Sequence, residues 1–573
     1  MKIIDALPLS QWLKTYNKAG FSRDFIAGII VAIVLVPQSM AYALLAGVPA
    51  EYGLYCAIIP TLLYSFLGSS RHLSVAPAAL ISILVASSVS NLQPESDAQY
   101  LQYVTMISFL SGVFLIIMRL LRFGNITRFI SIPVISGFTS AAAIIITTSQ
   151  LKYILGVSIP NGLSFIETLG YLFDALPETN FSVLSIGLLC CFSLWFFKAP
   201  WEKVIDRLGL RLWLRQMVTR SGPLFVVLAA ALLVGLLQLD VTQNIAIVGE
   251  IPKGLPQLQW ISLDIEVLQK LAVPSLLIAL MCFLTSVAVG NNLAAKRKER
   301  LKPNQELLAL GVANVGAALS GTFALAASLS RSAVSYNAGS ETTIASMISA
   351  IGVLITLFLF TSLFYFLPLV ALSAIVIMSV IPMIELKKIV YYWRINRADA
   401  VSLAITFLAV LAFGIDIGIG VGILCSIVLL IQRASHPHIA EVGRIGNTEH
   451  FRNMDRHEVT LHSSVVVVRV DESLYFANAE YIEAYILALC GKKPNMQHLV
   501  FMFSSVNFID ASAIEMFSSL IPKLKHQNIC LHFSEVKGPV LDQIKNTDLL
   551  NILEPGRMFL STDQALRALS KYM

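Results

Sequence analysis

The sequence predicts a large α-helical polytopic membrane domain followed by a smaller water-soluble α/β domain. Of the 573 residues, 56% are hydrophobic and 13% are charged, which is about half the charged fraction of a typical soluble domain. Fourteen apolar segments lie within the first 434 residues, and 28 of the 76 Asp, Glu, Lys and Arg residues lie in the last 139 positions. The modest net charge of +6 does not suggest nucleic-acid binding.

The fourteen apolar segments are expected to cross the membrane. A spanning helix needs roughly 20 apolar residues to cross about 30 Å of hydrocarbon. The run that begins at Phe25 is expected to be the first span rather than a cleaved signal peptide, because many more spans follow it. The expected spans lie near 25–45, 52–69, 73–91, 101–121, 126–150, 181–198, 223–239, 268–290, 304–321, 324–338, 342–366, 367–385, 399–414 and 416–433.

The basic loops all fall on one side of the predicted membrane. Lys and Arg cluster after spans four, six, eight and twelve, near residues 119–128, 198–220, 296–302 and 387–397. The alternate loops are acidic, and only Lys152 and Lys253 oppose their acidic residues. The positive-inside rule therefore predicts cytoplasmic termini in a multi-pass protein of the cell inner membrane.

The last part of the chain has a different pattern. Apolar runs near 465–470, 499–503 and 529–533 alternate with helical patterns near 479–490, 511–526 and 538–547. This alternation is typical of an α/β domain with a covered sheet. The expected division is an N-terminal cytoplasmic segment (1–20), a transmembrane domain (21–434), a linker (435–458) that also holds a first strand, and the soluble domain (459–573).

Two of the expected spans begin with extended or small-residue stretches, at residues 71–79 and 322–331. They belong to the third span of each half of the membrane domain. Because each half has an odd number of spans, the second half is inverted, and the two stretches approach each other from opposite faces. Paired broken helices at matching positions are typical of a transporter site, since irregular backbone at that depth must line a cavity or be buried in protein.

Arg331 is expected to be the one cation near the membrane interior. The positive dipole ends and free N–H groups of two helix N-termini favour an anion, and a buried arginine would strengthen that preference. The alternative is an arginine that pairs with backbone carbonyls or extends to the membrane interface. These features predict an anion site between the two broken spans.

Several motifs resemble those of the SulP anion transporter family, which is the same as solute carrier family 26. They lie at residues 37–49, 52–55, 67–72, 304–307 and 328–331. The resemblance covers nearly the whole chain and implies that the soluble part is a STAS domain. It also implies a seven-plus-seven inverted repeat like that of uracil permeases. Spans one to four and eight to eleven would form a core domain, and the others a gate domain.

The resemblance implies that the anion lies between the third and tenth spans and moves with the core as an elevator. The site would be formed by Gln38, Tyr42, Ala78, Ser328, Ser330 and Arg331. Gln38 as a packing amide and Tyr42 as a core aromatic are the alternatives. Ala78 replaces an aromatic residue of vertebrate relatives, which favours larger oxyanions or dicarboxylates over halides. The family also implies a homodimer within the membrane lipid.

Thr285 departs from the family pattern. Many bacterial and plant relatives carry Asp or Glu at this position in the eighth span, where it is implicated in proton or sodium coupling. A hydroxyl group does not titrate near neutral pH, and no other carboxylate lies within residues 268–290. Exchange or uniport is therefore expected rather than cation symport. Glu306 and Asp416 lie near span ends, where capping or packing is expected.

The soluble domain contains a candidate phosphorylation site at Ser512. The sequence Asp510-Ala511-Ser512-Ala513 resembles the phosphorylatable loop of anti-sigma-factor antagonists, although those proteins have Asp-Ser-Ser or Asp-Ser-Thr followed by Gly. Phosphate there would be stabilised by the helix N-terminus. The alternative is that Asp510 or Ser512 caps that helix. A cytosolic partner of the STAS domain is a further expectation.

These observations predict a secondary transporter of a small anion rather than an enzyme. The sequence has no Walker A motif, Rossmann glycine pattern or catalytic-triad spacing, and its seven cysteines lack metal-ligand spacing, so no metal or cofactor is expected. Sulfate, bicarbonate, chloride, nitrate and dicarboxylates all remain candidate substrates. One alternative function is a membrane-anchored STAS signalling scaffold. A scaffold transports no anion, so truncation after about residue 434 would abolish no flux. The other alternative is a passive anion channel.

Overall fold

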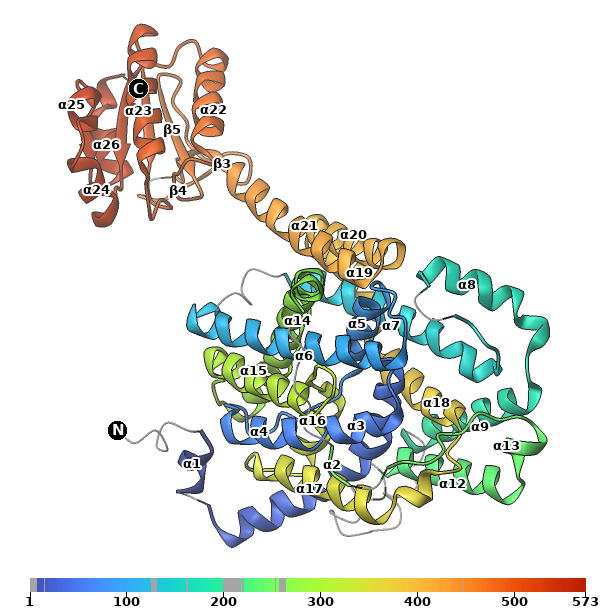
Figure 1. The fold of residues 1–573 in the computed structure, drawn as a ribbon. Coiled ribbons are helices and arrows are strands. Elements are labelled where there is room, and N and C mark those ends of the chain that lie inside the picture. Colours follow the sequence, from blue (N-terminus) through green and yellow to red (C-terminus); the bar gives the residue numbers. More distant parts are fainter. Residues whose placement is uncertain are drawn as a thin grey trace. The chain divides into compact units, whose positions relative to one another are not determined.

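Each of the fourteen expected spans contains a helix in a computed structural model of the chain (Figure 1). The structure describes residues 8–14, 16–124, 131–160, 163–198, 218, 221–252, 254–256, 264–446 and 448–572. In span order the helices are α2 (Lys18–Leu45), α3 with α4 (Ala50–Cys56 and Ile59–Leu67), α5 (Ala79–Ser90), α6 (Asp97–Leu120), α7 (Ile132–Leu155), α9 (Phe181–Lys198), α12 (Gly222–Leu236), α14 (Ile265–Arg297), α15 (Pro303–Leu319), α16 (Leu329–Asn337), α17 (Ile344–Leu359), α18 (Leu369–Val380), α20 (Arg397–Phe413) and α21 (Ile415–Ser435).

Some sequence features lie outside the described residues. They are Arg128, Lys253, the basic residues between 199 and 217, Arg220, and the side chains of Lys198 and Asp416. Among the described helices, seven are long and apolar enough to cross a membrane, when α3 is taken together with α4 and α18 together with α19 (Lys387–Ile395). Four shorter apolar helices accompany them. Shorter surface helices also occur at α1 (Pro8–Leu13), α8 (Phe165–Asp174) and α13 (Leu239–Thr242).

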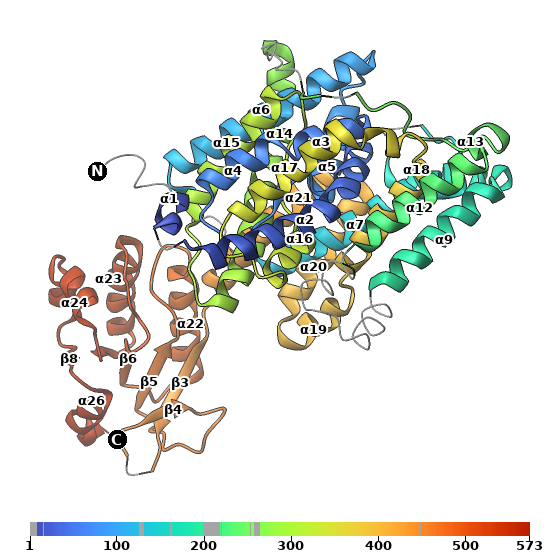
Figure 2. The ribbon, with the colours of Figure 1, turned by 90° about the horizontal axis from the view of Figure 1, so that it is seen from below.

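The membrane helices pack in two groups. In the core group, α6 packs against α14 and α15, and α2 packs against α3 and α17. Figure 1 shows α6 and α15 side by side, although they come from different halves of the chain. In the gate group, α7 packs against α9, α18 and α20, and α9 packs against α12; Figure 2 shows α9, α12 and α13 together at one edge. This division matches the expected core and gate.

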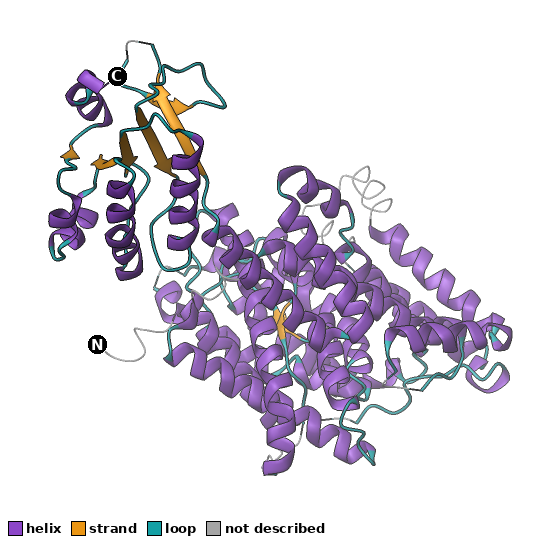
Figure 3. Ribbon diagram, turned by 90° about the horizontal axis from the view of Figure 1, so that it is seen from above, coloured by secondary structure: helices purple, strands orange, loops and turns teal. Residues whose placement is uncertain are grey.

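The two broken spans meet in the middle of the membrane domain. Their extended parts form the strands β1 (Val75–Ala76) and β2 (Ala326–Ala327), which pair antiparallel with Val75 opposite Ala327. The pair is visible among the helices in Figure 3. The backbone N–H of Ser328 also donates to the carbonyl of Ser74 at 3.1 Å. The two segments therefore run in opposite directions where they meet, as the inverted second half predicts.

Two fully buried carboxylates hold the core helices together. The Oε1 of Glu306 accepts hydrogen bonds from the backbone N–H and hydroxyl of Ser69, both at 2.7 Å, and its Oε2 accepts one from Tyr64 at 2.8 Å. Asp24, at the start of α2, accepts hydrogen bonds from Tyr16, the backbone N–H of Glu341, and both the N–H and hydroxyl of Thr342. Each buried charge is therefore matched by several donors. For Glu306 this is the packing role expected from the sequence.

The C-terminal unit, residues 427–573, is a sheet covered on both faces. The strand order is β4-β3-β5-β6-β7-β8, and β5 to β8 are parallel. The strands are β3 (Ile439–Arg444), β4 (Phe451–Asn453), β5 (Val465–Val470), β6 (His498–Met502), β7 (Cys530–Ser534) and β8 (Met558–Phe559), and the helices are α22 (Ala479–Lys492), α23 (Ala511–His526), α24 (Gly538–Lys545), α25 (Leu549–Leu553) and α26 (Thr562–Ala568). The first strand expected within residues 435–458 is β3, which pairs antiparallel with β5.

The alternation of β5 explains the two covered faces. Val466 and Val468 pack in the cluster formed with α22 to α25, whereas Val465 and Val467 pack in the cluster that includes α26. Successive side chains of a strand point to opposite faces, and both faces are apolar here. An uninterrupted valine run is therefore what a sheet covered by helices requires.

Two histidines on neighbouring strands form a partly buried contact in this unit. The Nδ1 of His498 lies 3.1 Å from the Nε2 of His532, and the backbone N–H of Arg557 donates to the Nδ1 of His532 at 3.1 Å. That bond leaves the proton of neutral His532 on Nε2, where it points to His498. Cys530 lies beside the pair, but His532 Nε2 then lacks the lone pair that a metal ion needs.

We predict that the C-terminal unit loses stability when the pH falls from 7 to 5. Burial, and then the neighbouring charges of His498 and Arg557, lower the pKa of His532 from 6.5 to about 4. Below about pH 6.5 the unfolded chain therefore binds a proton that the folded domain does not, which costs up to about 1.4 kcal/mol per pH unit. Hydrogen exchange of β6 and β7 in the full-length protein would measure this loss.

The matched control is a second histidine of the same unit. His532→Gln is expected to reduce the pH dependence, whereas His450→Gln, which changes an exposed histidine, is expected to leave it unchanged. Equal pH dependence in the wild type and His532→Gln would contradict the assignment.

Candidate functional site

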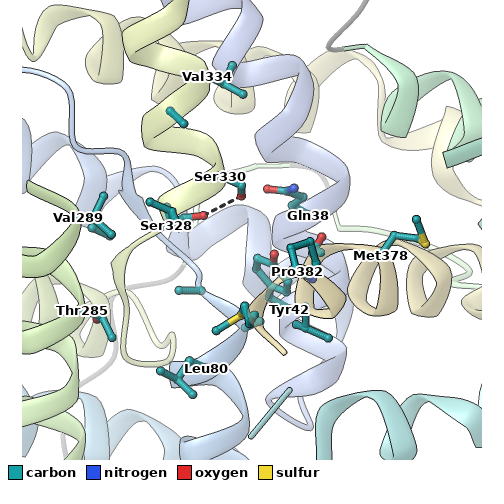
Figure 4. A pocket seen from close by; sticks show the side chains of 18 of the residues that line it. Gln38, Tyr42, Leu80, Thr285, Val289, Ser328, Ser330, Val334, Met378 and Pro382 are labelled. Carbon is teal, nitrogen blue, oxygen red and sulfur yellow. Dashed lines mark hydrogen bonds between the residues drawn. The ribbon is translucent and has the colours of Figure 1, made fainter. Parts of the chain in front are cut away.

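A cavity of about 600 Å³ lies where the broken spans of the core face the gate. Figure 4 shows Thr285 and Val289 of α14 on one side of it and Met378 and Pro382 of the gate on the other. Most of the predicted site residues line this cavity: Gln38, Tyr42, Ala78, Thr285, Ser328 and Ser330. Residues separated by about 290 positions in the sequence therefore come together at one site.

Gln38 and Tyr42 are presented by α2. They lie four residues apart, on one face of the helix, and follow Pro37 in the helix interior. Both side chains are buried within the protein while bordering the cavity. Gln38 is also a hydrogen-bond partner inside the core, because its Oε1 lies 3.4 Å from Nη1 of Arg331. The amide therefore links the cavity wall to the buried guanidinium.

The N-termini of α5 and α16 both open on the cavity. Ala78 and Ser328 occupy the N-cap positions with extended backbone, and neither N-terminus is capped by a side-chain hydrogen bond. First-turn residues of both helices, including Leu80 and Ser330, line the cavity. The first N–H groups of a helix have no partner within the helix. The cavity wall therefore offers backbone donors at two positive dipole ends.

Arg331 lies behind the cavity wall rather than in it. Its side chain is 0% exposed, its Nη2 donates to the carbonyl of Pro77 at 2.6 Å, and its Nε has no partner. Its guanidinium carbon lies 6.0 Å from the centre of the Tyr42 ring. The arginine thus pairs with a backbone carbonyl, one of the expected alternatives, and does not extend to the interface. Within the described part of the chain no carboxylate forms an ion pair with it, so its charge is uncompensated.

Thr285 lines the cavity, but its hydroxyl proton is used by its own helix. The Oγ1 donates to the carbonyl of Met281 at 2.6 Å. Thr285 therefore offers the cavity an acceptor oxygen and a methyl group. It provides no charge near the site.

Polar side chains of neighbouring helices, which the sequence analysis did not identify, hold the extended segments in place. Thr61 donates to the carbonyl of Val75, and Ser286 accepts from the N–H of Ala327. Asn314 bonds both the N–H and the carbonyl of Leu325, and Ser332 accepts from the N–H of Ser74. Unpaired backbone groups are costly at this depth, so these side chains position the site. Small polar residues of this kind occur in most of the spans, so the sequence alone did not mark these as positioning residues.

The candidate phosphorylation site is a capped helix N-terminus. The Oδ1 of Asp510 accepts from the N–H of Ala513 at 2.9 Å, and its Oδ2 accepts from the N–H of Phe476 at 2.8 Å. Asp510 is therefore the N-cap of α23, as one alternative expected. Ser512 is exposed in the first turn of this helix, and its phosphorylation stays a prediction.

Comparison with known proteins agrees with this architecture. The model of the sulfate permease family matches residues 21–406, and that of the STAS domain matches residues 456–565. The chain is 33% identical to the probable sulfate transporter 4.2 of Arabidopsis thaliana, over all of this chain and 84% of that protein. It is 30% identical to the solute carrier family 26 member 10 of Mus musculus, over 99% of this chain and 87% of that protein.

Solved structures have the same fold. The murine solute carrier 26 family member A9 anion transporter, in the inward-facing state, matches with a TM-score of 0.89 at 24% identity, over 99% of this chain and 94% of that chain. The transmembrane domain of a cyanobacterium bicarbonate transporter matches with a TM-score of 0.59 at 20% identity, over 72% of this chain and 98% of that chain. The fold of the chain is thus a known one.

We predict that Gly53→Ala disturbs the site through α3. A Cβ atom at Gly53 would overlap the carbonyl of Ser39, next to Gln38 on α2. Overpacking of this kind costs about 1–3 kcal/mol, so the melting temperature of the detergent-purified protein should fall. Gly420→Ala is the control, because a Cβ atom there meets open space. Equal melting temperatures of the two variants would contradict the close packing of α3 on α2.

Proposed function

Because the chain belongs to the sulfate permease family of anion transporters, we propose that it carries sulfate or a related oxyanion, bicarbonate or a dicarboxylate across the membrane. The observation that carries the proposal is the uncompensated charge of Arg331 beside two uncapped helix N-termini. A buried cation without a counter-charge is unfavourable. An anion in the cavity would supply that charge and accept hydrogen bonds from the first-turn N–H groups.

Two observations support an oxyanion as the substrate. Ala78 places a methyl group at the N-cap of α5, and the cavity of about 600 Å³ has room for an ion larger than a halide. The relatives from Arabidopsis thaliana at 33% and 32% identity are described as sulfate transporters. Bicarbonate and dicarboxylates fit the same donors, because these also accept hydrogen bonds through oxygen atoms bearing negative charge.

The division into core and gate supports an elevator mechanism. The anion-binding groups Gln38, Ala78 and Ser330 all belong to the core, whereas Met378 and Pro382 belong to the gate. Movement of the core past the gate would carry the whole site across the membrane without breaking the β1–β2 pair. On the gate side the cavity reaches Phe197 and Glu385, which adjoin the basic loops. With those loops in the cytoplasm, the cavity faces the cytoplasm.

We assign anion exchange or uniport to the protein rather than cation symport. Thr285 has no titratable group, and its hydroxyl proton bonds within α14. A proton or sodium ion would therefore lack a carboxylate at this position. We further propose a homodimer in the cell inner membrane, with cytoplasmic termini and a cytosolic partner at the STAS domain near Ser512.

Uptake of labelled sulfate into liposomes that contain the purified protein tests the function. Uptake is expected to rise when chloride or bicarbonate is loaded inside and to be indifferent to proton and sodium gradients. Gradient-driven uptake would contradict the assignment of exchange. Absence of transport with sulfate, bicarbonate and dicarboxylates alike would contradict the proposed substrates.

Arg331→Ala is expected to weaken sulfate binding at least about tenfold, because it removes the charge behind the site. Isothermal titration measures the affinity, and the melting temperature shows that the variant folds. Arg331→Lys is the control, since it keeps the charge and is expected to bind more tightly than Arg331→Ala. Full affinity in Arg331→Ala would remove this residue from the site.

Thr285→Glu is expected to make uptake depend on pH. A carboxylate at this position lines the cavity and lies on the helix that faces the site. Its protonation would then accompany anion binding, so that uptake rises as the external pH falls. Thr285→Gln is the uncharged control of nearly the same size. An unchanged pH profile in Thr285→Glu would contradict a coupling role for this position.

A further inference from the structure

Glu385 provides the formal charge in the wall of the site cavity. Among the described residues that line the cavity, Glu385 is the only Asp, Glu, Lys or Arg. It follows the short helix η5 (Ile381–Met383) of the gate. The cavity of an anion transporter thus has a negative charge in its gate wall, for which anion binding by the core offers no explanation.

The carboxylate of Glu385 is held in a defined position. Ser136 of α7 donates to its Oε2 at 3.0 Å, and Lys388 forms an ion pair with the same oxygen at 2.6 Å. The backbone N–H of Glu385 donates to the hydroxyl of Ser140 at 3.0 Å, one turn along α7. Side chain and backbone are therefore both fixed to the same gate helix.

The ion pair is asymmetric with respect to the cavity. Glu385 lines the cavity, whereas Lys388 does not. The negative end of the pair is thus nearer to an anion in the cavity than the positive end. The other gate residues of this wall, including Met378 and Met383, are mostly apolar, and charges are less screened beside such a surface than in water.

We propose that Glu385 determines the charge preference of the cavity by penalising a divalent anion about twice as strongly as a monovalent one. The Coulomb energy between the carboxylate and the anion is proportional to the charge of the anion. The inference rests on the proposed function, because it requires that the transported anion enters this cavity. It adds a specificity-determining residue on the gate, which does not belong to the anion-binding groups of the core.

The position of Glu385 restricts the penalty on divalent anions to one face of the membrane. Glu385 belongs to the gate and would not travel with the core. Glu385 therefore repels the anion only in the conformation in which the core holds the anion in the same cavity as Glu385. A carrier must release its substrate as well as bind it, and a site that binds too tightly releases slowly. On this face of the membrane, the carboxylate of Glu385 favours release of divalent anions.

Binding of sulfate and nitrate to the full-length protein in detergent tests the proposal. Isothermal titration at pH 7 and constant ionic strength compares wild type with Glu385→Gln, which keeps an acceptor for Ser136. The dissociation constant is expected to fall about threefold for nitrate and about tenfold for sulfate, because doubling an energy squares the fold-change. Lys388→Gln, which removes the compensating charge, is expected to weaken sulfate binding more than nitrate binding.

Two control variants separate charge selectivity from structure. Glu299→Gln removes a carboxylate that does not line the cavity. Glu299 resembles Glu385 in two ways: its side chain is 36% exposed, against 39% for Glu385, and it forms an ion pair, in its case with Arg71. Glu299→Gln is expected to leave the ratio of the two dissociation constants unchanged. Ser136→Ala removes a hydrogen bond to Glu385 but keeps its charge, and it is expected to change the ratio of the two constants less than Glu385→Gln does.

The outcomes distinguish the two proposals. If Glu385→Gln shifts sulfate and nitrate by the same factor, or if Glu299→Gln changes the ratio as much, the charge preference does not come from Glu385 and the inference is overturned. If the wild-type protein binds and transports anions when either of these two results is obtained, the proposed function stands. If wild-type protein binds neither anion and transports none, the proposed function fails, and the inference fails with it.

Discussion

The site depends on one unbalanced charge, the guanidinium of Arg331, which is buried at the centre of the core without a carboxylate among the described residues to pair with it. Its hydrogen bonds to Pro77 and Gln38 satisfy some of its donors but leave its positive charge. The two uncapped helix N-termini add partial positive charge on the same side of the cavity. The site is therefore most favourable when an anion is present.

A permanently positive site within the membrane needs a rigid frame. The extended segments before α5 and α16 cannot satisfy their own backbone groups, as a continuous helix does. Thr61, Ser286 and Asn314 supply these partners from neighbouring helices, and the β1–β2 pair supplies more. Further out, the buried carboxylates of Asp24 and Glu306 anchor α2, α4 and the following loops. The core is thus connected by polar bonds that involve few residues of the gate.

The gate has the opposite character. Its wall of the cavity is largely apolar, with Glu385 as its charged residue, and Glu385 is bonded to α7 rather than to the core. An apolar wall makes few directional bonds, so in the proposed elevator mechanism the core would pass it at low cost. In the proposed mechanism, charge on the core attracts the anion and Glu385 on the gate opposes it. The balance between the two depends on which part of the gate the core faces.

The sequence by itself determined the fold class and the spans, and most of the site residues it predicted line the cavity. Length and hydropathy are local properties, and the motifs around Gln38 and Ser330 are contiguous, so both can be read without the fold. Tertiary structure alone showed that Arg331 lies behind the wall and that Glu385 lines the cavity. These facts depend on contacts between segments far apart in the chain. Whether a polar residue binds backbone, another side chain or a ligand is decided by its neighbours in space.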